Sequence, residues 1–208
     1  YRKLLDGDPS DTTAAFNLGL SYLRSRRLDD ALDVFTDLIQ TDPAMAEACY
    51  QRGNVYDDLD NGDRALTDYS RAIELKPDYL QAYYNRGVVL ARLGRHEEAV
   101  VEFDEAIALQ PNLSNAHLNL GASLDELTQH EEAIAAYSEA IRCNPDNANA
   151  YFNRARTHYL LGDVQETIDD YTAAINLAPD DAEAFNNRGL AYDASGEYEK
   201  AVDDYAQA

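Results

Sequence analysis

The side chains that could bind a metal ion or act as nucleophiles include four histidines and two cysteines. A metal site needs such ligands at short, regular spacing, and these residues show none among themselves. They are His96, His117, His130 and His158, with Cys49 and Cys143. We therefore expect packing or surface roles for the histidines and small buried roles for the cysteines, with no disulfide, metal or other cofactor.

A second candidate for metal chemistry is the acidic segment 57–63, which hints at a calcium-binding loop. Its glycine falls one position early relative to Asp58, and Tyr69 stands where a bidentate carboxylate is required. The segment is better interpreted as a turn. No phosphate-binding loop, dinucleotide motif or nucleophile elbow occurs. The sequence indicates no catalytic residue, and we do not expect an enzyme.

The chain is richer in groups that form hydrogen bonds without reacting. A carboxamide recurs every 34 residues, at Asn17, Gln51, Asn85, Asn119, Asn153 and Asn187. The position before it is mostly aromatic, with Phe16, Tyr50, Tyr84, Leu118, Phe152 and Asn186. Carboxamides both donate and accept, as an extended peptide backbone does. Aromatic rings add contact area at low entropic cost.

These two series predict a ligand-binding surface, to which we add Asn54 and the basic residues Arg92 and Arg156. Acidic residues lie among the basic ones, so the charge of the ligand stays open. Asparagine is a mediocre helix former and has no reason to recur within helices on a merely solvated face. The alternative interpretation is that some amides brace neighbouring repeats and that the aromatic rings belong partly to the core.

An ionic pattern accompanies the amides. Arginine and an acid stand sixteen residues apart as Arg52 and Asp68, Arg86 and Glu102, Arg154 and Asp170, and Arg188 and Asp204. In the same two series, Leu18 is matched by Val34 and Leu120 by Ala136. We predict arginine–carboxylate pairs between the two helices of one repeat. The alternative is that the repeats were duplicated from one ancestral repeat. The arginine and the acid would then recur together without contacting each other.

The spacing of the prolines indicates which secondary-structure elements position these residues. The prolines stand 34 residues apart, at Pro9, Pro43, Pro77, Pro111, Pro145 and Pro179. Between prolines, apolar residues recur at helical separations in two stretches, for example 83–93 and 99–109. A short segment at Gly94 separates these two. Proline then ends the second helix, because it lacks a backbone donor and restricts the residue before it. Each period is predicted to be helix, turn, helix, stop.

A further series contains small residues: Gly19, Gly53, Gly87, Gly121, Ala155 and Gly189. Alanine recurs twelve residues later, as at Ala31 and Ala65. We expect the small residues to let paired helices approach closely opposite the alanines, and a larger side chain at Gly53 to cost roughly 1–3 kcal/mol.

The pattern within a period resembles the tetratricopeptide repeat, a helix-turn-helix unit of 34 residues. The resemblance is carried by Ala15, Leu18, Gly19, Tyr22, Ala31, Phe35 and Pro43 and recurs along the chain, although the tryptophan common in the family is absent. It implies an all-α fold, a right-handed α-solenoid or superhelix of antiparallel helix pairs. It divides the chain into the end of a preceding repeat (1–11), repeats at 12–45, 46–79, 80–113, 114–147 and 148–181, and a truncated repeat at 182–208.

Charge and length narrow the choice of partners. The formal charge of −22 makes nucleic acid and anionic membranes poor partners, because both are bound through clustered basic residues. No apolar run is long enough for membrane insertion. A chain that opens at Tyr1 and ends within a period suggests part of a longer array, with uncapped ends that could associate end to end. The compartment cannot be identified. The cytoplasm is favoured, and the acidic, lysine-poor composition is also compatible with high salt.

Together these features predict a scaffold that binds an extended peptide or partner segment on the concave face lined by the first helices. The resemblance implies the same, because superhelical members of the family hold peptides with asparagine ladders. Other members of the family hold the terminal carboxylate of a ligand with paired lysine and asparagine. The two series of this chain contain no lysine. Two alternatives stay open: a substrate-recruiting or regulatory arm of a larger enzyme, and a structural spacer without a ligand.

Overall fold

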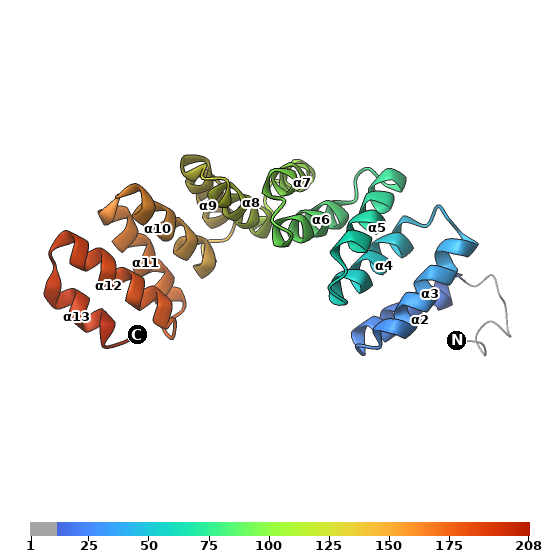
Figure 1. The fold of residues 1–208 in the computed structure, drawn as a ribbon, viewed down its shortest axis with the longest axis horizontal. Helices are drawn as coiled ribbons and strands as arrows, with labels where there is room; N and C mark the ends of the chain where they lie inside the picture. The colour runs from blue at the N-terminus through green and yellow to red at the C-terminus, as the bar shows by residue number, and fades with distance from the viewer. Residues whose placement is uncertain (1–11) are drawn as a thin grey trace. The chain divides into compact units, whose positions relative to one another are not determined.

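The computed structural model describes residues 12–208, and this part of the chain folds into twelve helices without a strand (Figure 1). None of these helices is long and apolar enough to cross a membrane. Segment 1–11, with Pro9 and the predicted end of a preceding repeat, lies outside the described residues. The helices are α2 (Thr12–Arg24), α3 (Leu28–Thr41), α4 (Ala46–Asp58), α5 (Gly62–Leu75), α6 (Leu80–Arg92), α7 (His96–Leu109), α8 (Ser114–Glu126), α9 (His130–Cys143), α10 (Ala148–Leu161), α11 (Val164–Leu177), α12 (Ala182–Ser195) and α13 (Tyr198–Tyr205).

The chain forms two compact units, one ending at Glu105 and one beginning at Ala106. In the first unit α2 packs on α3, α3 on α4, α4 on α5 and α5 on α6. In the second unit the same succession runs from α8 to α13. The first helices of neighbouring pairs also touch, α2 with α4, α8 with α10 and α10 with α12. Each unit is therefore a stack of helix pairs with its first helices side by side, which confirms the predicted all-α solenoid class.

The turn inside each pair contains one residue with positive φ. These residues are Arg26 (59°), Asp60 (56°), Gly94 (73°), Thr128 (61°), Gly162 (85°) and Gly196 (80°). Glycine adopts this conformation without steric cost, whereas other residues pay about 1–2 kcal/mol. Thr128 is β-branched and is the most strained of the set. The turn geometry is thus imposed by the packing of the two helices even where the local residue opposes it.

The turns between successive pairs contain the prolines. Pro43 stands two residues after the end of α3. There the Asp42 backbone N–H donates to the Leu38 carbonyl at 2.7 Å, and Met45 donates to the Asp42 carbonyl at 3.2 Å. The prolines at 77, 111, 145 and 179 occupy the same place after their helices. Their predicted role as helix stops is confirmed.

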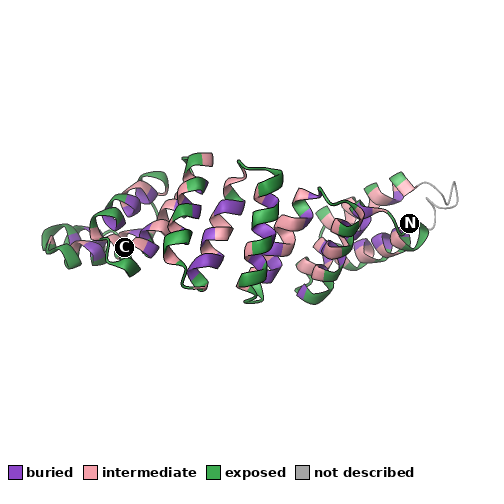
Figure 2. Cartoon of the chain, turned by 90° about the horizontal axis from the view of Figure 1, so that it is seen from above, coloured by how far each residue is buried: buried purple, intermediate pink, exposed green. Residues whose placement is uncertain are grey.

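The core of each unit is built around aromatic rings of the second helices. Phe35, Tyr69, Phe103, Tyr137 and Tyr171 are at most 2% exposed. Figure 2 shows buried residues on the helices alternating with exposed ones, so each helix turns one side to the core and the other to solvent. The period of the apolar residues therefore fixes which side of each helix is buried.

The small-residue series lies against these same rings. A Cβ on Gly53 would lie 2.7 Å from a ring carbon of Tyr69, and one on Gly121 would lie 2.6 Å from Tyr137. The alanine series is more distant, since the Ala65 carbonyl oxygen would lie at 3.4 Å from that Cβ on Gly53. Close approach of paired helices is confirmed, and the group that limits the size of the side chain is the aromatic ring rather than the alanine.

Candidate functional site on the first helices

All residues predicted to bind a ligand lie on the first helices of the pairs. In the first unit the amides bond to one another. Asn85 Nδ2 donates to the Tyr50 hydroxyl at 3.0 Å and to Asn54 Oδ1 at 2.9 Å. Asn54 Oδ1 also accepts from the Tyr69 hydroxyl at 2.8 Å, and Asn54 Nδ2 donates to Gln51 Oε1 at 3.1 Å. This network joins α6 to α4 and α4 to α5. Here the amides brace neighbouring helices, as the alternative interpretation holds.

The aromatic residues of the first unit pack on core rings. The Phe16 ring meets Phe35 edge-on, with centroids 5.8 Å apart. The Tyr50 ring lies 4.9 Å from Tyr79, and the Tyr84 ring lies 6.1 Å from Phe103. All three first-helix rings are half-buried. They contribute to the core while keeping one edge at the surface.

Asn17 and Arg92 complete the predicted residues of this unit. Asn17 is exposed on α2. Arg92 donates to Asp57 Oδ1 at 2.5 Å, and its guanidinium also lies 3.7 Å from Asp60. The basic residue at the end of α6 is therefore neutralised by the end of α4.

In the second unit, four predicted residues line one hollow. Leu118 and Asn119 of α8 and Phe152 and Asn153 of α10, all half-buried, surround a volume of about 320 Å³. The walls are completed by Ala122, Asn149, Asp181 and Glu183. We call this hollow, lined by eight residues, the amide groove. It combines amides, an aromatic ring and two carboxylates from three successive first-helix segments.

The amide groove is negatively charged, because no basic residue is among the described residues that line it. Asp181 caps α12, where its Oδ1 accepts the backbone N–H groups of Glu183 and Ala184 at 3.1 Å. Glu183 is exposed. Phe152 is held edge-on against Tyr171, with ring centroids 5.4 Å apart. The apolar wall is thus fixed by the core, and one carboxylate faces solvent.

Arg156 and Asn187 meet elsewhere, in a smaller hollow of about 170 Å³. They line it with Tyr159, Tyr171 and Leu190. Burial raises the pKa of Tyr171 to about 12, so its hydroxyl stays protonated at neutral pH. The predicted residues of the second unit are therefore divided between two hollows.

Asp125 is a buried carboxylate that the sequence patterns did not single out. Its Oδ2 accepts from the Tyr137 hydroxyl at 2.9 Å and from Thr157 Oγ1 at 2.6 Å, and its Oδ1 lies 3.0 Å from His130 Nδ1. Asp125 therefore joins α8, α9 and α10. Aspartate stands at this place in every second repeat, at 57, 125 and 193, and that recurrence is the signal that could have identified it.

The predicted arginine–carboxylate pairs are all present. Arg52 donates to both oxygens of Asp68 at 2.7 Å. The same two bonds of 2.7 Å hold Arg154 on Asp170 and Arg188 on Asp204. These hydrogen bonds raise the pKa of the three arginines despite their partial burial. The pairing of the two helices by charge is confirmed.

Each of the four arginines also makes a contact that the sequence patterns did not predict. Its Nη1 donates to a hydroxyl on the second helix of the preceding pair, sixteen residues earlier. The distances are 3.4 Å to Thr36, 3.0 Å to Ser70, 2.8 Å to Ser138 and 3.0 Å to Thr172. Each arginine thus joins two helix pairs. Where leucine replaces it at Leu120, the residue sixteen positions earlier is Asp104 rather than a hydroxyl.

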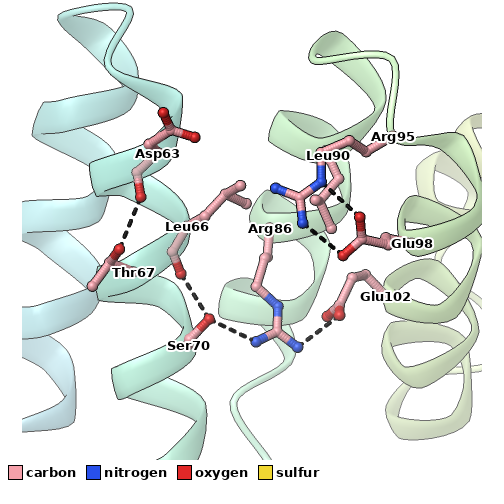
Figure 3. A pocket seen from close by; sticks show the side chains of 9 residues that line it. All are labelled: Asp63, Leu66, Thr67, Ser70, Arg86, Leu90, Arg95, Glu98 and Glu102. Carbon is pink, nitrogen blue, oxygen red and sulfur yellow. Dashed lines mark hydrogen bonds and ion pairs between the residues drawn. The ribbon is translucent and has the colours of Figure 1, made fainter.

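Arg86 differs from the other three arginines. It lies at a polar hollow of about 480 Å³ between α5, α6 and α7 (Figure 3). Its Nη2 donates to Glu102 Oε1 at 2.7 Å, while Arg86 Nε and Glu102 Oε2 are buried without a partner. Burial raises the pKa of Glu102. The longer glutamate holds the guanidinium through one bond where aspartate uses two.

The structure brings together three side chains that the spacing along the sequence does not connect. His117 of α8 lies beside Glu139 and Cys143 of α9, with their potential ligand atoms within 4.8 Å of one another. Cys143 is half-buried rather than buried, and both cysteines are free. Spacing along the sequence did not reveal this group, because contacts between paired helices join residues far apart in the chain.

Two family models match most of the chain. A family model described as tetratricopeptide repeat matches residues 1–46 and 50–114, and one described as TPR repeat matches 126–162 and 155–196. No curated protein sequence matches the chain.

Several solved structures are similar to it. PilW, a type IV pilus biogenesis factor, is 24% identical with a TM-score of 0.79, and the match covers 95% of this chain and 92% of that one. The pilF protein of Pseudomonas aeruginosa is 20% identical with a TM-score of 0.80, covering 97% and 91%. YrrB, a TPR protein with an unusual peptide-binding site, is 25% identical with a TM-score of 0.72, covering 83% and 89%. These similarities confirm the fold.

Proposed function

Because the chain belongs to the tetratricopeptide repeat family, we propose that it is a protein-interaction scaffold that binds an extended partner segment in the amide groove. The observation that carries this proposal is that Asn119 and Asn153 line one hollow with Leu118 and Phe152. Amides can pair with the donors and acceptors of a peptide backbone, and the apolar residues can cover a side chain. YrrB, a similar TPR protein with a peptide-binding site, supports peptide binding by this fold.

The first unit is a poorer place for a ligand. Asn85 is engaged by Tyr50 and Asn54. Leu118 and Ala122 stand in the same positions relative to Asn153 as Tyr50 and Asn54 do relative to Asn85. Their side chains carry no polar atom that could bond to the amide. Asn85 therefore braces helices in the first unit, whereas Asn153 lines the hollow in the second. We place the ligand in the second unit for this reason.

The carboxylates favour a cationic partner. Asp181 and Glu183 line the amide groove, and the chain carries a net charge of −22. A lysine or arginine of the ligand would gain a charged partner there, with an apolar side chain against Phe152. Attraction of this kind weakens as salt screens it. The proposed ligand is an extended segment with a basic residue near an apolar one.

Selection of peptides from an unbiased random library on the immobilised protein tests this proposal. We expect the selected peptides to be enriched in lysine or arginine near an apolar residue. Calorimetry with the best peptide should show at least tenfold weaker binding to Asn119→Ala/Asn153→Ala, about 1.4 kcal/mol, because two amide contacts are lost. Asn17→Ala, an exposed amide on α2, is the matched control and should bind as the unaltered protein does. Equal binding by the groove variant, or enrichment of acidic peptides, would contradict the proposal.

We also propose that copies of the molecule associate through α13. Tyr198 and Val202 are 63% and 66% exposed. In α11 the residue at the equivalent position to Val202 is Ile168. Ile168 is only 7% exposed, because α11 packs on α12. The outer face of α13 thus has the apolar character of a face that a neighbouring helix covers, and a second copy would cover it.

Sedimentation velocity over a range of concentrations tests this association. Val202→Asp should lower the fraction of dimer, because it places a charge on the exposed apolar face. Leu160→Asp on α10, at a residue 60% exposed, is the control and should have no effect. A protein that stays monomeric at every concentration would rule the association out.

A further inference from the structure

We propose that His117, Glu139 and Cys143 form a binding site for a zinc ion. Their potential ligand atoms lie within 4.8 Å of one another, on α8 and α9 of the second unit. Imidazole, thiolate and carboxylate are the three side-chain types that bind Zn²⁺ in proteins. The group belongs neither to the amide groove nor to any ion-pair series.

Two of the three side chains meet at one backbone carbonyl. His117 Nε2 lies 2.9 Å from the Pro111 oxygen, and Cys143 Sγ lies 3.7 Å from the same oxygen. Glu139 precedes Cys143 by four residues, so both lie on one face of α9. His117 is only 8% exposed, so its ring lies largely inside the protein beside α9.

The sequence of the repeats sets this place apart. The corresponding residues to His117 in the flanking repeats are Tyr83 and Tyr151, and those to Cys143 are Leu109 and Leu177. Both flanking repeats have an aromatic ring and a leucine here. One repeat alone therefore substitutes two metal-binding side chains at once, on two different helices that bring them together.

The geometry requires a small closure. In a tetrahedral zinc site with bonds of about 2.0–2.3 Å, neighbouring ligand atoms lie about 3.3–3.8 Å apart. The present separations, all within 4.8 Å, exceed these values by at most about 1.5 Å. Glu139 is exposed and accepts a hydrogen bond from Arg142 Nε at 2.8 Å, and it is the ligand that would leave this partner to close the site.

Binding of the ion rearranges two protons. The Cys143 thiol loses its proton to solvent and binds as thiolate. The proton on His117 Nε2, which now faces the Pro111 oxygen, moves to Nδ1, and the ring turns from that oxygen so that Nε2 offers a lone pair to the ion. Water completes the fourth position. The ion would link α8 to α9 beside the turn that contains Pro111.

Titration with Co²⁺ tests the site, because a cobalt–thiolate bond produces a near-ultraviolet charge-transfer band that carboxylates and imidazoles do not. The full chain should develop this band, and the band should saturate at one Co²⁺ per protein. Added Zn²⁺ should displace the cobalt and remove the band. Cys143→Ser should abolish the band, and His117→Gln should weaken cobalt binding by at least about tenfold. Cys49→Ser, which removes the other, buried cysteine, should keep the band unchanged.

A second measurement guards against misfolded variants. Zn²⁺ should raise the Tm of the unaltered protein and of Cys49→Ser, and leave the Tm of Cys143→Ser unchanged, with all three showing the same helical circular dichroism. Absence of the cobalt band in the unaltered protein overturns the proposal. So does a band that survives in Cys143→Ser or disappears in Cys49→Ser.

Discussion

Each arginine of the ion-pair series stabilises two helix pairs at once. Arg52 holds Asp68 of its own pair through two bonds and reaches Thr36 of the preceding pair. The Asp68 side chain is 5% exposed, so its charge depends on this arginine for compensation. A buried carboxylate without a partner is far more costly than an apolar residue at the same place.

This dependence predicts an asymmetry between variants. Arg52→Ala should lower the free energy of unfolding by about 3–5 kcal/mol, because it leaves Asp68 buried and unpaired. Arg52→Leu combined with Asp68→Ala should cost much less, since Leu120 and Ala136 already occupy these positions in another repeat. Urea unfolding of both variants measures the difference, and Arg92→Ala serves as the exposed control. Equal losses of stability in the single and double variants would contradict the conclusion that Arg52 stabilises the fold by compensating Asp68.

The glycines beside the aromatic rings predict a change of unusual sign. Alanine in place of glycine within a helix normally stabilises it by about 1 kcal/mol. At Gly53 the new Cβ would lie 2.7 Å from a Tyr69 ring carbon, so Gly53→Ala should destabilise by roughly 1–3 kcal/mol. The control is Ala155→Gly, where a Cβ is already accommodated beside Tyr171 and its loss should also destabilise. Thermal unfolding that shows Gly53→Ala to be more stable would contradict the packing described.

Some residue contacts could be predicted from the sequence and others could not. The arginine pairs were predictable because both members change together at Leu120 and Ala136. The amide series was ambiguous because the role of each amide depends on residues more than thirty positions away. Asn85 bonds to Asn54, whereas the place corresponding to Asn54 is Ala122 in the amide groove. The same amide can therefore brace a helix or line a hollow.

At the scale of the elements, the turns inside the pairs carry local strain. The helices were predictable because apolar residues recur at helical separations between the prolines. The turn at Gly94 was predictable as well. The left-handed conformation of Arg26, Asp60 and Thr128 was not, because only the packing of the paired helices imposes it on residues that disfavour it.

Relief of this strain predicts a stabilising substitution. Thr128→Gly should raise the free energy of unfolding by about 0.5 kcal/mol, since the relief of about 1–2 kcal/mol is partly offset by the freedom of glycine in the unfolded chain. The reverse change, Gly94→Thr, should lower it by about 0.5 kcal/mol, because the same two effects act with opposite sign. Chemical unfolding of the two variants, measured side by side, distinguishes these outcomes. A loss of stability in Thr128→Gly would show that the turn is not strained.

At the scale of the whole molecule, the buried tyrosines govern stability in alkali. Burial raises the pKa of Tyr69, Tyr137 and Tyr171, the last to about 12. In the unfolded chain these hydroxyls lose their protons near pH 10. A group whose pKa is raised by folding contributes stability that is complete below pH 10 and is lost as the pH rises toward the folded value.

The free energy of unfolding should therefore fall between about pH 10 and pH 12. For Tyr171 alone the loss is at most about 1.4 kcal/mol per pH unit. Tyr171→Phe should flatten this part of the curve, because the ring is kept and the ionising group is removed. Tyr22→Phe, on the less buried surface of α2, is the control and should leave the slope unchanged. Identical slopes in Tyr171→Phe and the unaltered protein would contradict the assignment.

The central claim is that the amide groove of the second unit, and not the amides of the first, holds the partner. Titration of the protein with the best selected peptide, followed by NMR of the side-chain amides, tests this most directly. We predict that the signals of Asn119, Asn149 and Asn153 shift on binding, while those of Asn54 and Asn85 stay in place because they bond to each other. Shifts confined to Asn54 and Asn85 would contradict the claim.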